Sequence, residues 1–96
     1  MAVELEALIG IGEGEKAEFK AQWSEAALET LAAFANGQGG RLLVGVDDDG
    51  RIIGWQGSDK DLRATSDRIA DALRIQPSLE VRVLNGKRLL VIEVAS

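Results

Sequence analysis

Two short apolar runs constrain the fold of this chain most strongly. Residues 41–47 have the sequence RLLVGVD, and residues 89–94 have the sequence LLVIEV. Runs of this length, with apolar residues at consecutive positions, predict strands that are buried on both faces. We therefore expect 41–47 to form a central strand and 89–94 to form a second buried strand.

Residues 17–24 show a different pattern, in which apolar and polar positions alternate. A period of two predicts a half-buried strand. We expect Phe19 and Trp23 on the core face of this strand. Glu18 and Lys20 are then expected to point outward together.

The remaining elements follow from the same periodicities and from turn residues. Helices are expected within 1–10 and over 24–36 and 59–75, and strands over 51–55 and 79–83. Asn85-Gly86 predicts a type I′ hairpin before the last strand. The order is β-α-β-β-α-β-β, which predicts an α+β domain with a mixed sheet and two helices on one face.

The residue types that are missing exclude several kinds of chemistry. The 96 residues contain no cysteine and no histidine. A disulfide framework, a thiolate zinc site, a cysteine nucleophile and the usual histidine-based triads are therefore excluded. The length predicts one domain over 1–96. Nothing in the sequence indicates a small-molecule cofactor.

Charge is distributed unevenly along the chain. The net charge of −5 has the wrong sign for a general polyphosphate binder. Residues 1–50 carry ten acids and three bases, whereas residues 51–96 carry six acids and eight bases. The sequence shows neither a membrane-spanning run nor a signal peptide. We expect a cytoplasmic protein without a membrane partner.

Acidic residues in the first half are candidates for metal chemistry. Glu18 and Lys20 share a strand face, and a carboxylate beside an ammonium suits a metal-dependent phosphodiesterase. An ordinary ion pair on a solvated strand is the alternative. Asp47, Asp48 and Asp49 at a strand end offer further oxygen ligands. Their alternative role is a hairpin turn, which favours Asp for backbone reasons.

Basic residues in the second half are candidates for phosphate contacts. The helix predicted over 59–75 carries Arg63, Arg68 and Arg74 together with Lys60, and its four aspartates could simply balance these four cations. Lys87 and Arg88 follow the Asn-Gly turn and could touch a nucleic-acid backbone. A charged hairpin tip is the alternative there.

Several short motifs occur together in a characteristic order. They are Gly12-Glu13, Glu18-Phe19-Lys20, Ala33-Phe34-Ala35-Asn36 with Gly39-Gly40, Val44-Gly45-Val46-Asp47-Asp48, Ile53-Gly54, and Gln76-Pro77 before the terminal apolar strand. Over about residues 10–96 this arrangement resembles the Schlafen-type, AlbA-like domain, which is assigned to DNA binding. The resemblance implies a nucleic-acid-binding module of a prokaryotic transcription regulator or helicase-related protein. It also implies that this chain is a fragment of a longer protein.

The candidate residues fall into two sets. For binding DNA or RNA, the basic residues that we take as candidates are Lys20, Arg63, Arg68, Arg74, Lys87 and Arg88. The Schlafen branch implies an endoribonuclease site of three acids, which falls on Glu13, Glu18 and Asp48, with Asp47 as the rival and Lys20 beside them. Only this alternative calls for Mg²⁺ or Mn²⁺. A third alternative is a non-catalytic homodimer that pairs through exposed sheet edges.

Overall fold

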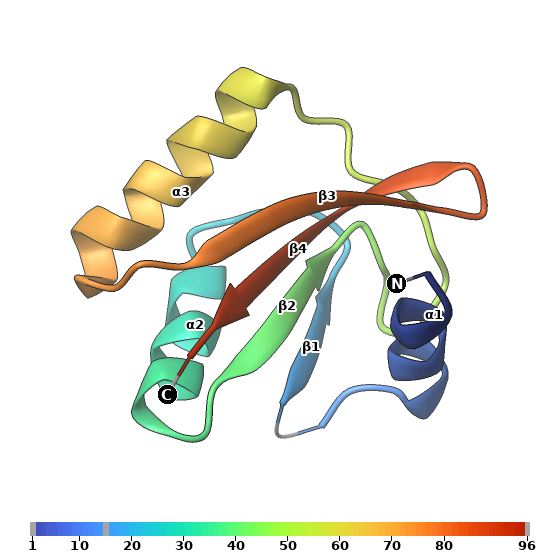
Figure 1. Ribbon diagram of the computed structural model, residues 1–96, viewed down its shortest axis with the longest axis horizontal. Coiled ribbons are helices and arrows are strands. Elements are labelled where there is room, and N and C mark those ends of the chain that lie inside the picture. The colour runs from blue at the N-terminus through green and yellow to red at the C-terminus, as the bar shows by residue number, and fades with distance from the viewer. Residues whose placement is uncertain (1, 15, 96) are drawn as a thin grey trace.

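The computed structural model describes residues 2–14 and 16–95 (Figure 1). Its elements are α1 (Ala2–Ile11), β1 (Ala17–Lys20), α2 (Ala27–Asn36), β2 (Gly40–Val44), α3 (Asp59–Leu73), β3 (Ser78–Leu84) and β4 (Lys87–Val94). This order confirms the predicted α+β class. The first helix falls where a short one was expected.

The four strands form one mixed sheet in the order β1-β2-β4-β3. β1 runs parallel to β2, and Phe19 pairs with Leu43. β4 is antiparallel to both of its neighbours, so that Ile92 pairs with Leu42 on one side and with Leu79 on the other. The last strand of the described chain therefore lies inside the sheet.

Helices cover both faces of this sheet (Figure 1). α2 and α3 pack on one face, where Leu31, Phe34 and Ile69 meet the side chains of Leu42 and Val44. The prediction of two helices on one face is thus confirmed.

α1 packs on the opposite face. There Leu5 joins a cluster with Phe19, Leu43 and Leu89. Leu42 and Leu43 point to opposite faces and both are fully buried, as predicted for a strand that is covered on two sides. The apolar run of β2 therefore reflects contact with helices on both of its faces.

The hairpin between β3 and β4 has the predicted turn. Asn85 and Gly86 both have positive φ, at 53° and 74°. A type I′ turn requires positive φ at both central residues, and Asn and Gly tolerate it best. The turn brings Leu84 opposite Lys87 at the start of the ladder.

The segment 51–55 differs from the expected full strand. It makes one bridge, between Val46 and Ile52. The Gly45 carbonyl then accepts hydrogen bonds from the N–H groups of both Ile53 and Gly54, at 2.8 and 2.9 Å. Two donors on one carbonyl interrupt the regular ladder, and the chain turns away toward β4.

The prediction for Trp23 also needs correction. β1 ends at Lys20, so Trp23 is no longer in register with Phe19. Phe19 belongs to the cluster under α1, whereas Trp23 packs against the cluster under α2 and α3. The alternation of apolar and polar residues continues past Lys20, but the strand does not. Beyond that point the alternation no longer determines which face a side chain lies on.

The two edges of the sheet are treated differently. Gly14 bridges to Ala17 and covers part of β1, whereas β3 carries Val83, a residue that is 63% exposed. Among residues 2–14 and 16–95, none of the helices has the length and apolar character needed to cross a membrane. Pairing of two copies through an edge stays a prediction.

Candidate nucleic-acid interface

Side chains of β1 alternate between two environments. Ala17 and Phe19 are buried, whereas Glu18 and Lys20 are half-buried on the other face. Glu18 faces α2 and lines a hollow that Thr30 and other residues of that helix border. Glu18 and Lys20 thus lie on one face at the edge of the sheet, as strand geometry requires.

Glu13 reaches this edge from the segment between α1 and β1. Its Oε2 atom accepts a hydrogen bond from the backbone N–H of Phe19, at 2.9 Å. Gly14 exchanges hydrogen bonds with Ala17 one step earlier, with N···O distances of 3.0 and 3.4 Å. The segment before β1 therefore satisfies backbone groups along the edge of β1 and brings the Glu13 carboxylate next to Glu18.

The pKa of Glu18 is raised above its ordinary value of 4.5. Partial burial is the largest cause, followed by a hydrogen bond with the Glu13 carboxyl group and by the negative charge of Glu13. The Lys20 ammonium opposes this shift, and the charge of Asp48 adds to it. These four residues, Glu13, Glu18, Lys20 and Asp48, are called the acidic corner below.

Asp47 and Asp48 have different roles in the turn after β2. Asp47 Oδ1 accepts hydrogen bonds from the N–H groups of Asp49 and Arg51, at 3.0 and 2.8 Å. This contact is the usual way in which Asp stabilises a turn. Asp48 is exposed, and its charge acts on Glu18. Asp47 and Asp48 were the two candidates for the third acid of the site. Asp48 acts electrostatically on Glu18, whereas Asp47 stabilises the turn.

Carboxylate oxygens suit Mg²⁺ and Mn²⁺, so the acidic corner has the right chemistry for a metal. Its geometry does not fit, because the described residues contain no group of three or more acidic side chains placed to hold an ion. Glu13 is also engaged by the Phe19 N–H and by Glu18.

The cations at the start of β4 hold the neighbouring loop. Lys87 donates to the carbonyl of Ile52 at 3.2 Å. Arg88 donates through Nη1 to the carbonyl of Gly57 at 2.8 Å, and its guanidinium lies 5.3 Å from the ring centre of Trp55. Both side chains are exposed and their partners are neutral, so their positive charges are not cancelled.

The cations of α3 are spread along the helix. Arg68 donates through Nε to both carboxylate oxygens of Glu25, at 3.0 and 3.1 Å, which lowers the pKa of Glu25. Arg74 ends the helix in a left-handed conformation with φ of 56°. Arg63 is exposed on the helix surface. Lys20 lies on the edge strand β1, which β2 separates from β4. The predicted phosphate contacts therefore do not form a single patch.

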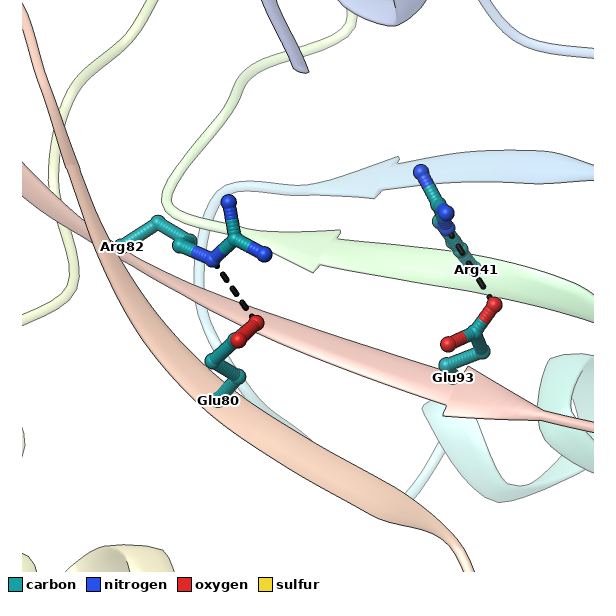
Figure 2. Close-up of polar contacts among 4 residues, drawn as sticks. All are labelled: Arg41, Glu80, Arg82 and Glu93. Atoms are coloured by element: carbon teal, nitrogen blue, oxygen red, sulfur yellow. Dashed lines mark hydrogen bonds and ion pairs between the residues drawn. The ribbon is translucent and has the colours of Figure 1, made fainter. Parts of the chain in front are cut away.

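Sequence reasoning missed a set of charges on the sheet face that α1 only partly covers. Figure 2 shows Arg41 paired with Glu93 and Arg82 paired with Glu80 on that face, with N···O distances of 3.4 and 2.7 Å. The signal was available in part, because Glu80 and Arg82 are two residues apart on a predicted strand. The pair between Arg41 and Glu93 required knowing that β2 lies beside β4.

Comparison with protein families gives a match to the family described as Schlafen, AlbA_2 over residues 13–96. The chain belongs to the Schlafen AlbA_2 family. The match includes β1, the acidic corner and every later element of the AlbA_2 domain. None of the curated proteins matches the chain.

Solved structures share this AlbA_2 fold. One is the N-terminal domain of a RecG-related protein from Nitrosomonas europaea, named for an ATP-dependent DNA helicase, with TM-score 0.76, 28% identity, and coverage of 99% of this chain and 72% of that chain. Another is the DIP2311 protein of Corynebacterium diphtheriae, with TM-score 0.70, 23% identity and 98% of this chain covered. The AlbA_2 domain spans 22% of that second chain.

Proposed function

We propose that this AlbA_2 domain binds nucleic acid through contacts to the phosphate backbone. The observation that carries the proposal is the family match over residues 13–96, together with the similarity to a domain of a protein named for a DNA helicase. In that setting the domain would hold DNA or RNA for another part of a regulator or helicase-related protein.

The basic residues differ in how well placed they are to bind phosphate, because their present partners differ in charge. Lys87 and Arg88 are exposed and donate to neutral carbonyls, so they keep their full charge and further N–H donors. Arg63 is exposed as well. Arg68 is neutralised by Glu25, and Lys20 lies among carboxylates. We therefore assign the main phosphate contacts to Lys87, Arg88 and Arg63.

A salt titration tests this proposal. Affinity for a short DNA or RNA should fall linearly on a log–log plot of binding constant against salt, with a slope of about −0.9 per phosphate contact for duplex DNA. Lys87→Gln should reduce the slope by about 1 and weaken all sequences equally. Lys60→Gln, a cation between two aspartates on α3, is the matched control and should change little. Absence of binding at about 50 mM salt would end the proposal.

A metal-dependent endoribonuclease is the second candidate, and the electrostatics of the acidic corner favour it. Partial burial, and then the neighbouring Glu13 and Asp48 carboxylates, raise the pKa of Glu18 beside the Lys20 ammonium. Close acidic groups with shifted pKa values are typical of functional sites. A cation here would have to compete with the Phe19 N–H for Glu13.

Cleavage of a single-stranded RNA with and without Mg²⁺ or Mn²⁺ tests this second candidate. Activity should require the metal and disappear in Glu18→Gln, because that change removes a charged oxygen ligand. Glu29→Gln, on the exposed side of α2, is the matched control and should cleave normally. Equal cleavage by the Glu18→Gln variant would assign the activity to a contaminant.

A further inference from the structure

Both tryptophans of the chain line one pocket beside the first half of α3. Its volume is about 470 Å³, within the range of small-ligand sites. Trp23 and Trp55 supply aromatic walls, Ala64 and Thr65 come from α3, and Asp61 and Arg68 are the charged residues of the lining. We call this the two-tryptophan pocket.

Contacts from Arg88, and from Gly57 in the pocket lining, fix the Trp55 wall. The Arg88 guanidinium lies 5.3 Å from its ring centre. The backbone N–H of Trp55 donates to the backbone carbonyl of Arg88 at 2.7 Å. Gly57 approaches the ring so closely that a Cβ there would lie 2.1 Å from Cζ2. Trp55 is 8% exposed and belongs to the core, so its ring is held in place before any ligand arrives.

The charged residues of the pocket are also held in place. Asp61 Oδ2 accepts hydrogen bonds from the N–H of Ser58 at 2.8 Å and from its hydroxyl at 3.0 Å. Arg68 is fixed by hydrogen bonds from Nε and Nη2 to the Glu25 carboxylate, with Nε at 3.0 and 3.1 Å from its two oxygens. An acceptor group and a donor group therefore border a space with aromatic walls.

We propose that the two-tryptophan pocket takes one unpaired nucleobase of the bound nucleic acid. A base has flat faces for the indole rings, and its edge carries both donors and acceptors for Arg68 and Asp61. This inference rests on the proposed function, because it adds a base contact to binding through phosphates.

The base pocket sets a preference for the form of the nucleic acid. In a duplex, each base is stacked and paired, so extracting it requires a few kcal/mol. A single strand, a bulge or a loop offers unstacked bases without this free-energy cost. The AlbA_2 domain should therefore bind single-stranded segments more tightly than a duplex of the same sequence at equal salt.

Tryptophan fluorescence reports directly on the pocket, because it contains both indoles of the chain. The probe is an oligothymidylate, and the matched probe is the same length of abasic backbone, which keeps the phosphates and removes the bases. We expect the oligothymidylate to quench the emission and to bind about tenfold more tightly than the abasic strand, as loss of a stacked base predicts. The abasic strand should bind without quenching.

Pocket variants separate the base contact from folding and from phosphate binding. Ala64→Leu fills the pocket from an exposed position of α3, and Ala72→Leu makes the same change on α3 outside the pocket lining. Ala64→Leu should bind oligothymidylate about tenfold more weakly and the abasic strand unchanged, whereas Ala72→Leu should match the wild type on both. Trp23→Leu removes one half-buried ring, leaves Trp55 as the reporter, and should show the same loss.

The possible results distinguish a failure of the base-pocket proposal from a failure of the proposed nucleic-acid binding. Salt-dependent binding with no quenching, and with equal affinity of the wild type and Ala64→Leu, would overturn the base pocket and leave the proposed function standing. Equal affinity for oligothymidylate and the abasic strand would do the same. No binding of single strands, duplex or RNA at low salt would overturn both proposals.

Discussion

Gly45 shows how one residue without a side chain controls the end of a central strand. Its φ is +107°, and a Cβ built on it would lie 2.8 Å from the backbone carbon of Gly54 and 3.0 Å from the nitrogen of Trp55. Its carbonyl also accepts the two N–H groups that end the short bridge with 51–55. Close backbone approach and positive φ both require glycine here.

We predict that Gly45→Ala destabilises the domain by about 2 kcal/mol or more, because backbone atoms cannot yield as a flexible side chain can. Urea unfolding followed by circular dichroism measures the effect. Gly10→Ala is the control, because nothing lies within 4 Å of a Cβ built there. In a helix that change should be neutral or stabilise by up to about 1 kcal/mol. Equal midpoints for the two variants would contradict the assigned role of Gly45.

The shifted pKa of Glu18 predicts a dependence of stability on pH. A raised carboxyl pKa means that the folded state holds the proton more tightly than the unfolded state. The stabilisation is complete below the ordinary value of 4.5 and is lost as pH rises through the folded pKa. Glu18→Gln removes this loss, so the variant should unfold at higher urea than the wild type at pH 7.

The same comparison at pH 4 checks the cause. At pH 4, below the ordinary value of 4.5, Glu18 is mostly protonated in both states, and the advantage of Glu18→Gln should shrink. A gain in stability that is equal at pH 4 and pH 7 would mean that the charge of Glu18 is not responsible.

At the scale of elements, α3 begins with a complete capping box. The Ser58 hydroxyl accepts a hydrogen bond from the N–H of Asp61, and the Asp61 carboxylate accepts one from the N–H of Ser58. The Ser58 N–H and the Ser58 hydroxyl both donate to the Asp61 carboxylate, which lowers the pKa of Asp61. The box fixes the end of α3 that carries the Asp61 side of the two-tryptophan pocket, so the cap serves both the helix and the pocket.

We predict that Ser58→Ala costs about 1 kcal/mol of stability, the usual effect of losing an N-cap side chain. Ser66→Ala, within the same helix, is the control and should be neutral or slightly stabilising, since alanine favours helix. Thermal unfolding of both variants measures the difference. A loss in Ser66→Ala as large as that in Ser58→Ala would contradict the capping role.

For the whole molecule, the sequence was sufficient to predict the elements that depend on local pattern. The apolar runs predicted the buried strands, and Asn85-Gly86 predicted the hairpin turn. The face that α1 covers was not predictable, because that helix is connected by a short glycine-containing segment to an edge strand. The pair between Arg41 and Glu93 depends on strand order, which no local pattern encodes.

The candidate site was predictable to a smaller extent. Family resemblance suggested Glu13, Glu18 and Asp48, and the structure brings their charges to bear on one another without testing any activity. The hydrogen bonds from Lys87 and Arg88 to the loop 52–57 could not be predicted, because they join segments about thirty residues apart in the sequence. Trp23 was misplaced because the strand period was carried past Lys20.

We predict that two copies of the domain pair along β3 at high concentration, since this edge carries the exposed Val83 and the β1 edge is partly covered. Val83→Lys should lower the association constant about tenfold, because edge lysines oppose strand pairing. Sedimentation equilibrium measures it. Ile11→Lys on α1, where the side chain is 82% exposed, is the control. Equal association of both variants and the wild type would place the contact elsewhere.

The position of β4 between β2 and β3 has a consequence for how the chain emerges from the ribosome. β2 and β3 are separated by β4 in the sheet, so a nascent chain cannot complete the sheet until residues 87–94 have left the exit tunnel. Until then, the apolar edge of β2 has no strand beside it on that side. A nascent chain that stalls before β4 emerges would therefore expose this apolar edge and would be a substrate for chaperones.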